Sequence, residues 1–387
     1  MTPYVFCSGY YRFGWVCSAL LVLALFSACS LEPHLAVAQA AAENRPAESS
    51  PAELPSGESS LIDNTQVAAQ TVASNTTALD GAALRPEVRA FIDEMVDRHG
   101  FDRTQLLRVF SQVQFRDDII ARMTRPAERV LVWHEYRDIF LDRQRIEGGV
   151  AFWQEHADTL ARAEQVYGVP PEIIVAIIGV ETRYGRITGR DVVMDALTTL
   201  AFDFPRRADF FRSELEHYLL LTREEQINPL TLKGSYAGAM GIAQFMPSSY
   251  RAYAIDFSGD GRRDLWNNPV DAIGSVASYL AEHGWQRNGR VTVDATLDNA
   301  QVADLTSNGL NRPQRSLRDW QTQGVRPQMA GPDGALAANL LAFEAQWGMW
   351  YQLTFNNFYV ITRYNRSRLY AMAVYELAQA IRSAYSG

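Results

Sequence analysis

An almost wholly apolar segment that ends in one carboxylate constrains this chain more than any other feature. Residues 170–185 read PPEIIVAIIGVETRYG, and every residue from Ile173 to Val180 is apolar or glycine. Two prolines suit the first turn of a helix, and Gly185 suits its end. A helix that is apolar all round lies inside a domain rather than on its surface. The segment therefore predicts a buried helix that carries Glu181 near its C-terminus.

The position of Glu181 on that helix predicts an unusual carboxyl group. It stands four residues after Ile177 and three after Ile178, so it shares their face. Desolvation and the negative end of the helix dipole both raise the pKa of a carboxyl group placed there. Such a group stays protonated near neutral pH and can act as a general acid. The alternative is a surface glutamate paired with Arg183 or Arg186.

The N-terminus predicts export and lipid anchoring. Arg12 precedes an apolar run that is shorter than the roughly 20 residues of a membrane span, and small residues lead to Cys29. This pattern is typical of a cleavable signal and resembles the lipobox of bacterial lipoproteins. We therefore predict a lipoprotein signal peptide over 1–28, with Cys29 acylated. The alternative is an ordinary signal peptide cleaved near Ala38 or Ala40.

Cysteine usage and the residue after Cys29 refine this prediction. Cys7 and Cys17 lie within the predicted signal peptide, so a mature chain would hold Cys29 alone and no internal disulfide. Ser30, rather than an aspartate, resembles the outer-membrane sorting pattern. The expected location is the periplasm of a Gram-negative bacterium, with the protein lipid-anchored to the outer membrane.

Composition divides the rest of the chain into a linker and one folded region. Residues 29–83 are rich in Ala, Ser, Pro, Glu, Asn and Thr and poor in aromatic residues, which predicts a flexible tether. Residues 84–387 are long enough for one sizeable domain. The formal net charge is −8 and no basic patch stands out, so nucleic acid is not an expected partner.

Hydrophobic periodicity predicts an α+β fold that is mainly helical. A strand is expected over 290–297, and 350–364 is rich in residues that favour strands, so a small sheet should form late in the chain. Helices are expected over 85–99, 102–113, 130–140, 149–167, 170–185 and 368–383.

Three later stretches combine aromatic rings, amides and close-approach glycines. They are FPRR (204–207), KGSYAGAMGIAQFMPSSY (233–250) and NFYVITRYN (357–365). Glycine lets the backbone come close to a ligand. Aromatic rings pack against sugar faces, and Asn or Gln can position an N-acetyl group, so a buried acid among them suits an amino-sugar site. Each of these residues taken alone is more often part of a core or a surface.

Taken together, the motifs resemble a known family. ETRYG (181–185), GAMGIAQFMPSSY (238–250) and NFYVITRYN (357–365) are similar to motifs of the membrane-bound lytic murein transglycosylase B family. The resemblance runs from about Leu84 to the C-terminus. It implies a lysozyme-like core with a helical lobe and a small β-containing lobe, and a lytic transglycosylase catalytic domain over 84–387.

The resemblance also assigns roles to residues. Glu181 matches the only catalytic acid/base of the family, and Arg206 and Arg207 match an arginine pair that meets the peptide stem of the substrate. Without the resemblance, that pair would be interpreted as solvated surface charge. The positions that match glycan-site residues are Tyr136, Ser235, Gln244, Tyr279, Tyr364, Asn365 and Tyr370.

The activity implied is non-hydrolytic cleavage of the MurNAc-β-1,4-GlcNAc bond of peptidoglycan, which leaves 1,6-anhydro-MurNAc ends for cell-wall turnover. Two-carboxylate glycosidases need a second acid, but the segments that match the glycan site contain no obvious one. Asp191 and Asp195 follow soon after Glu181, although helix capping or salt bridges explain them equally well. Substrate assistance by the N-acetyl group is the recognised exception. No catalytic cofactor is expected, and the enzyme is expected to act on murein strands with peptide stems as a monomer.

Residues 256–267 (DFSGDGRRDLWN) predict a calcium loop. They follow the EF-hand pattern of oxygen ligands, except that Asn267 replaces the glutamate at its twelfth position. The family resemblance implies that Asp271 supplies this last ligand, after one extra residue. The expected structural Ca²⁺ ligands are Asp256, Ser258, Asp260, Arg262 and Asp271. The alternative is an Asx- and Gly-rich turn without a metal.

Two other functions remain open at this point. A hydrolytic muramidase on the same fold would differ only in releasing reducing MurNAc ends. A non-catalytic murein-binding lipoprotein would bind the same glycan, but binding alone gives no reason to place Glu181 on a buried face.

Overall fold

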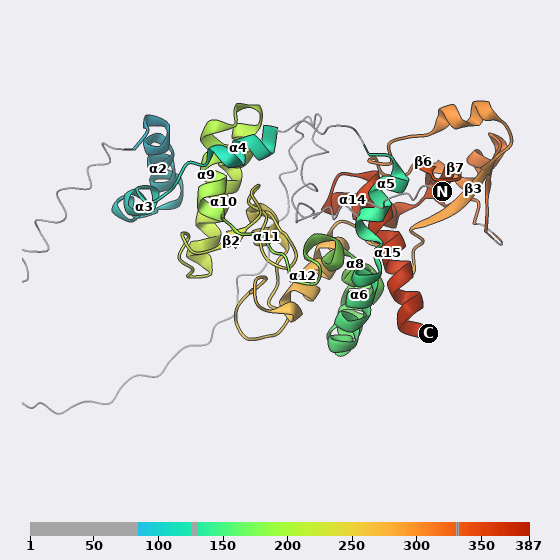
Figure 1. Cartoon of the computed structure of the whole chain (residues 1–387), viewed down its shortest axis with the longest axis horizontal. Coiled ribbons are helices and arrows are strands. Elements are labelled where there is room, and N and C mark those ends of the chain that lie inside the picture. The colour runs from blue at the N-terminus through green and yellow to red at the C-terminus, as the bar shows by residue number, and fades with distance from the viewer. Residues whose placement is uncertain (1–83, 125–130, 330, 332) are drawn as a thin grey trace, which may run out of the picture. The chain divides into compact units, whose positions relative to one another are not determined.

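The computed structural model describes residues 84–124, 131–329, 331 and 333–387 (Figure 1). The predicted signal peptide, the tether and Cys29 lie outside these described residues. The described chain forms two compact units, 84–111 and 112–387.

The smaller unit is a pair of helices, α2 (Pro86–His99) and α3 (Arg103–Phe110). Gly100 ends α2 with a φ of 62°, and the Asp102 carboxylate caps α3 by accepting a hydrogen bond from the Gln105 amide at 2.6 Å. The rings of Phe91 and Phe110 meet edge to face, 6.0 Å apart. Both predicted helices are confirmed, although the second ends before its predicted limit of 113.

The larger unit is built mainly from helices. The predicted helix over 130–140 begins at Trp133, and that over 368–383 extends to Ser386. The bounds of these helices are α4 (Asp117–Thr124), α5 (Trp133–Phe140), α6 (Arg143–Glu155), α7 (Ala157–Tyr167), α8 (Pro171–Thr182), α9 (Val193–Asp203), α10 (Ala208–Glu224), α11 (Pro247–Tyr253), α12 (Pro269–Glu282), α13 (Leu317–Thr322), α14 (Asn356–Tyr364) and α15 (Arg368–Ser386), with short 3₁₀ turns η1 (Pro205–Arg207) and η2 (Ala300–Leu305).

The helix expected over 149–167 is wrong in its bounds, because two helices share that stretch. His156 has φ −115° and ψ 25°, which interrupts the helical backbone between α6 and α7. Helix α6 also begins earlier, where the Asp142 carboxylate accepts a hydrogen bond from the Arg145 amide at 2.9 Å.

Helix α8 is the central buried helix, as its sequence predicts. Its residues from Pro171 to Val180 are all buried, and α6, α7, α12 and α15 pack around it. Burying one large aliphatic side chain contributes about 1.5–3 kcal/mol, so this helix is a main source of stability. Among the described residues, no single helix has the length and apolar character to cross a membrane, and only the bent pair α7 and α8 meets those criteria jointly.

A five-stranded antiparallel sheet forms the predicted small β lobe. Its strands are β3 (Thr292–Leu297), β4 (Arg315–Ser316), β5 (Val325–Pro327), β6 (Ala337–Ala345) and β7 (Gly348–Thr354), in the order β4-β6-β7-β3-β5. Leu340 and Leu353 of this sheet share a hydrophobic core with Trp320 of α13. Phe343 points to α5, where it meets Trp133 with ring centroids 5.6 Å apart.

The stretch 350–364 is only partly a strand, which corrects its prediction. Strand β7 ends at Thr354 and residues from Asn356 onward form α14. Phe358 and Ile361, three residues apart, both lie on the buried side of that helix. Aromatic and β-branched residues favour strands only where they fit a sheet, and here the helical packing decides. A further two-stranded sheet, β1 (Asp191–Val192) with β2 (Lys233–Gly234), has no counterpart in the predictions.

Candidate active site

Glu181 lies at the C-terminal end of α8 and is largely removed from solvent. The hydroxyl of the fully buried Tyr370 on α15 donates a hydrogen bond to Glu181 Oε1 at 2.6 Å. Burial raises the pKa of Glu181 to about 7, while the Tyr370 hydrogen bond acts in the opposite direction. This upward shift of the Glu181 pKa agrees with the expectation from its position on the apolar face of the helix. Among the described residues, Glu181 forms no ion pair with Arg183 or Arg186, the alternative considered from the sequence, and Arg183 Nη2 lies 3.3 Å from Asp142 Oδ2 instead.

Three tyrosines from three different helices surround this carboxyl group. Tyr136 lies on α5, Tyr364 ends α14 and Tyr370 lies in the first turn of α15. Burial is the main cause that raises the pKa of each hydroxyl, and the negative charge of Glu181 adds to it in all three. The structure therefore brings these three predicted residues together with Glu181.

A second set of aromatic contacts joins the glycine-rich loop to α12 and α14. The Tyr364 hydroxyl donates to the Ala243 carbonyl at 2.6 Å, and the Tyr279 hydroxyl donates to the Arg363 carbonyl at 2.7 Å. The Phe245 ring lies 5.5 Å from that of Tyr279 and 5.8 Å from that of Tyr364. The sequence placed Phe245 in a stretch that combines aromatic rings and amides, but it gave a site role to the tyrosines and not to Phe245.

Gln244 is held in a backbone conformation that few residues adopt, with a φ of 50°. Its Nε2 donates to the Thr188 carbonyl at 3.0 Å and to the Gly241 carbonyl at 2.9 Å. Across the described part of the chain, its Oε1 has no donor. An amide fixed in this way presents a free acceptor to an N–H group of a ligand.

Ser235 and Asn365 occupy two other backbone turns. The Ser235 hydroxyl oxygen accepts hydrogen bonds from the amides of Ala237 and Ala239, at 3.3 and 3.0 Å. Asn365 follows the last residue of α14 and is partly buried, and its side chain has no hydrogen-bond partner within the described ranges. Its amide can therefore orient a polar group of a ligand.

The arginine pair belongs to a different neighbourhood. Arg206 is exposed on η1, and the Arg207 guanidinium lies 4.1 Å from the ring centroid of Phe210. Burial lowers the pKa of Arg207, and the charge of Glu214 acts in the opposite direction. Glu214 in turn accepts hydrogen bonds from the amide and hydroxyl of Ser248, at 2.9 and 2.6 Å. The pair therefore lies beside α10 and α11.

The two aspartates considered as second acids have structural partners. The Arg122 guanidinium donates two hydrogen bonds to Asp191, both at 2.9 Å, and Asp195 accepts one from the Gln114 amide at 3.0 Å. Within the described residues, no other carboxylate contributes to the pKa of Glu181. The site thus holds one perturbed carboxyl group rather than a catalytic pair.

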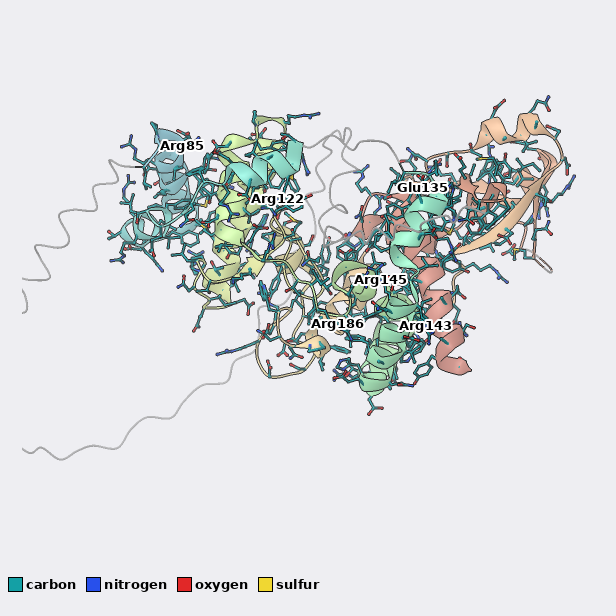
Figure 2. The ribbon with its side chains drawn as sticks, viewed as in Figure 1. Arg85, Arg122, Glu135, Arg143, Arg145 and Arg186 are labelled. Carbon is teal, nitrogen blue, oxygen red and sulfur yellow. The ribbon has the colours of Figure 1, made fainter. Side chains whose placement is uncertain are left out.

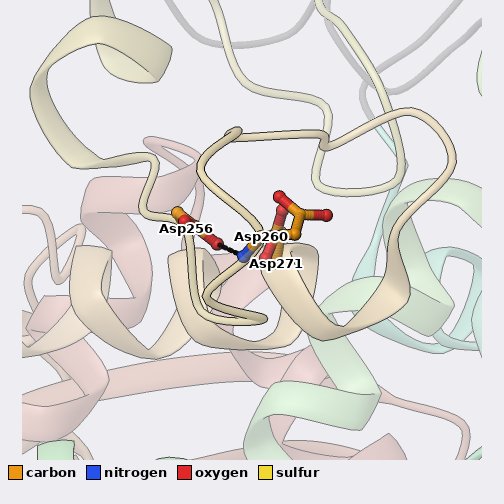
Figure 3. A group of neighbouring side chains, drawn as sticks. All are labelled: Asp256, Asp260 and Asp271. Atoms are coloured by element: carbon orange, nitrogen blue, oxygen red, sulfur yellow. Dashed lines mark hydrogen bonds between the residues drawn. The ribbon is translucent and has the colours of Figure 1, made fainter.

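The predicted calcium loop gathers three carboxylates in one place (Figure 3). One oxygen from each of Asp256, Asp260 and Asp271 lies within 4.8 Å of the others. Asp271 is fully buried in the first turn of α12, where it accepts hydrogen bonds from the amides of Ser258 at 2.8 Å and Asp264 at 3.0 Å. The extra residue in the loop therefore does not prevent Asp271 from reaching the cluster.

The donor set fits a hard cation. Three carboxylates so close together repel one another unless a cation lies between them, and calcium prefers such oxygen ligands. Asn267, at the twelfth position, donates instead to Asp264 at 3.1 Å, so it takes no part in the cluster. The hydroxyl of Ser258 lies 3.2 Å from Asp256 Oδ1, and Arg262 donates its amide to Asp260 at 2.9 Å.

A buried helix that ends in one perturbed acid with three tyrosines around it, in a mainly helical unit that also holds a small sheet, is the arrangement of a lysozyme-like enzyme that acts on glycans. The chain belongs to the family of the transglycosylase SLT domain, whose model matches residues 83–379.

Proteins with similar sequences and structures are lytic transglycosylases. The chain is 48% identical to the membrane-bound lytic murein transglycosylase B of Escherichia coli (strain K12) over 309 residues, which cover 77% of this chain and 83% of that protein. The soluble lytic transglycosylase SltB1 from Pseudomonas aeruginosa is 50% identical with a TM-score of 0.75, covering 78% of this chain and 100% of that one.

Two further solved structures contain bound groups. The Escherichia coli lytic transglycosylase Slt35 in complex with calcium is 47% identical, with a TM-score of 0.72 and coverage of 79% of this chain and 95% of that one. SltB3 from Pseudomonas aeruginosa in complex with NAG-anhNAM-pentapeptide is 32% identical, with a TM-score of 0.68 and coverage of 78% and 79%. This chain is thus a lytic transglycosylase that cleaves peptidoglycan, and the predicted family, fold class and activity are confirmed.

Proposed function

We propose that Glu181 alone carries the acid and base chemistry of this enzyme, and that the bond cleaved is MurNAc-β-1,4-GlcNAc. The observation that carries the proposal is the carboxyl group of Glu181, whose pKa burial raises to about 7 and one oxygen of which Tyr370 holds. Because Oε1 accepts from Tyr370, the proton of the neutral acid resides on Oε2, which is free to face the substrate.

In the first step, Glu181 Oε2 gives its proton to the bridging oxygen between the two sugars. The bond between MurNAc C1 and that oxygen breaks, and the carbonyl oxygen of the muramyl N-acetyl group forms a bond to C1 in its place. Asn365, whose side chain has no partner in the described chain, orients the N-acetyl group. General acid catalysis of this kind typically contributes about 10²–10⁴-fold.

In the second step, Glu181 acts as the base. Its carboxylate takes the proton of the C6 hydroxyl, the C6 oxygen bonds to C1, and the N-acetyl oxygen leaves. This closes the 1,6-anhydro ring without water and returns Glu181 to its protonated form. Attack by a group of the same sugar has a large proximity advantage over attack by solvent.

The remaining predicted residues bind the substrate in this proposal. Tyr136, Tyr279 and Tyr364 provide rings for the glycan, and the fully buried Tyr370 acts on it through Glu181. Ser235 and Gln244 provide backbone-anchored polar groups. Arg206 and Arg207 meet the peptide stem. The pentapeptide fragment bound by the SltB3 relative supports a substrate of this kind.

We also propose a structural Ca²⁺ at Asp256, Ser258, Asp260, Arg262 and Asp271, with no catalytic cofactor. The carboxylate cluster and the calcium complex of the Slt35 relative support it. Asp256, Asp260 and Asp271 would supply carboxylate oxygens, and the ion would offset their mutual repulsion and tie the loop to α12.

The proposed location is the periplasm, with a lipid anchor at Cys29 in the outer membrane and the tether 29–83 leading to a monomeric catalytic domain over 84–387. The Cys29 sequence pattern and the membrane-bound relative from Escherichia coli support this proposal.

The test is digestion of purified sacculi by the wild-type protein and by Glu181→Gln, with products identified by mass spectrometry. We expect anhydro-MurNAc ends from the wild type and a loss of rate of about 10²–10⁴-fold or more in the variant, because the amide can neither donate nor accept the catalytic proton. Reducing MurNAc ends would instead identify a hydrolytic muramidase. A wild-type protein that binds murein without releasing products would be a binding module.

A further inference from the structure

The turn that follows Glu181 has an unusual backbone. Arg183, Tyr184 and Gly185 are consecutive residues with positive φ values of 49°, 64° and 80°. Residues with a side chain rarely adopt this left-handed conformation, and two in succession persist only where their surroundings enforce it. Contacts on both sides of the turn hold it in place directly after Glu181.

Tyr184 is held in a socket formed by three glycines, Gly148 and Gly149 of α6 and Gly179 of α8, which we call the glycine socket. A methyl group at Gly179 would lie 2.6 Å from the Tyr184 hydroxyl oxygen, and one at Gly149 would lie 2.7 Å from it. One at Gly148 would lie 2.9 Å from Cε2 of the ring. No side chain larger than hydrogen fits at these positions while the ring stays where it is.

Two further contacts fix the ring inside the socket. The Tyr184 hydroxyl donates a hydrogen bond to the Arg145 carbonyl on α6 at 2.6 Å, and the Phe152 ring lies 5.6 Å away at an interplanar angle of 30°. Arg145 is labelled on its helix in Figure 2. The ring therefore ties the left-handed turn to α6.

The other side of the turn is tied to the glycine-rich loop. The hydroxyl of Thr182, which is fully buried, accepts a hydrogen bond from the Gly185 amide at 2.9 Å and donates one to the Ile242 carbonyl at 2.9 Å. Ile242 stands two residues before Gln244. The end of α8 is thus fixed from both sides within four residues of Glu181.

Glycines inside helices are unfavourable, and so are left-handed residues that are not glycine. Here three helical glycines and two left-handed residues that are not glycine lie next to one reactive group, Glu181. We propose that Tyr184 is a positioning residue: its ring, seated in the glycine socket, locks the turn after α8 and so fixes the direction of the Glu181 carboxyl group toward Tyr370 and the substrate. The inference rests on the catalytic role proposed for Glu181.

The test compares two variants. Gly179→Ala displaces the Tyr184 ring from the glycine socket, whereas Tyr184→Phe keeps the ring but removes its hydroxyl. A displacement of about 1 Å at a catalytic group can cost 10²-fold in rate. We expect kcat of Gly179→Ala to fall by roughly that factor with KM nearly unchanged, and kcat of Tyr184→Phe to stay within several-fold of wild type. In the double variant, Tyr184→Phe should add no further loss, because the ring is already displaced.

The pH profile separates positioning from simple destabilisation. A released turn admits water to Glu181, so its pKa should fall and the alkaline limb of kcat should move to lower pH in Gly179→Ala. Leu340→Ala, in the core of the β lobe, is the control: it should lower the melting temperature without changing kcat or the limb. If Gly179→Ala does not fold, Gly148→Ala is the milder variant, since its methyl group meets only the edge of the ring.

Two results would overturn the inference. One is a Gly179→Ala or Gly148→Ala protein with wild-type kcat and pH profile. The other is an equal fall of kcat in Leu340→Ala, which would assign the effect to stability alone. Either result leaves the proposed function intact, because that depends on the products of the wild-type protein and on Glu181→Gln.

Discussion

Replacing Glu181 by glutamine should stabilise the fold at neutral pH although it removes most of the activity. The amide keeps the size of the side chain, and its oxygen can still accept the hydrogen bond from Tyr370. The amide cannot ionise. The variant therefore avoids the cost of holding a negative charge away from water, which the wild-type protein bears whenever Glu181 is ionised.

The size of the effect follows from the pKa. Burial raises the pKa of Glu181 from 4.5 to about 7. At 1.36 kcal/mol per pKa unit, the difference of 7 − 4.5 lowers the free energy of unfolding by roughly 3 kcal/mol once the group is ionised. Between pH 4.5 and 7 the native state binds more protons than the unfolded state, so wild-type stability falls as pH rises through this window.

The assay is urea unfolding of wild type and Glu181→Gln below pH 4.5 and above pH 7. The two proteins should be nearly equal in stability at the lower pH, and the variant should be more stable by up to about 3 kcal/mol at the higher pH. Glu147→Gln, which replaces an exposed glutamate on α6 paired with Arg143, is the matched control and should not be more stable than wild type at the higher pH. A difference between wild type and Glu181→Gln that does not change with pH would show that Glu181 is not desolvated, and would refute the reasoning.

Three further predictions concern its neighbour, the metal loop and the anchor. Tyr370→Phe removes the donor that favours the Glu181 carboxylate, so the pKa of Glu181 should rise and the alkaline limb of kcat should move to higher pH in a pH–rate profile; an unmoved limb would contradict this. Calcium should raise the melting temperature of the wild type but not of Asp256→Ala combined with Asp260→Ala, since a ligand of the native state stabilises it; identical wild-type curves in calcium and chelator would exclude a stabilising site. Cys29→Ala should abolish palmitate incorporation and release the protein to the soluble periplasm, whereas unchanged labelling would exclude this anchor.

The fold could be predicted where local patterns and packing agree. Helix α8 follows from an apolar run between prolines and Gly185, and β3 follows from alternation. The break at His156 could not be predicted, because no proline or glycine marks it and α6 and α7 each pack on their own neighbours. The change from strand to helix after Thr354 also depends on packing, since the residues on both sides favour strands.

The site shows the same division between local and long-range information. The position of Glu181 on an apolar face is a local property, and it predicts the raised pKa. The hydrogen bond from Tyr370 joins residues far apart in the chain, and no spacing in the sequence reveals it. The glycine socket is also a long-range feature. In the sequence Gly148 and Gly149 only weaken the prediction of a helix, and the structure shows that the ring of Tyr184 occupies the space beside them.

Burial and the Tyr370 hydrogen bond shift the pKa of Glu181 in opposite directions, which suits a residue that must act first as an acid and then as a base. Burial alone would favour the neutral acid so strongly that the carboxylate, which the second step requires, would be a poor state to form. The hydrogen bond from Tyr370 stabilises that carboxylate and holds one of its oxygens, so the proton can leave from and return to the other. A pKa near 7 is the outcome of these two effects, and it allows one group to donate a proton and then to accept one without a second carboxylate. The buried end of α8 and the hydroxyl from α15 are therefore both needed, and neither would give this chemistry alone.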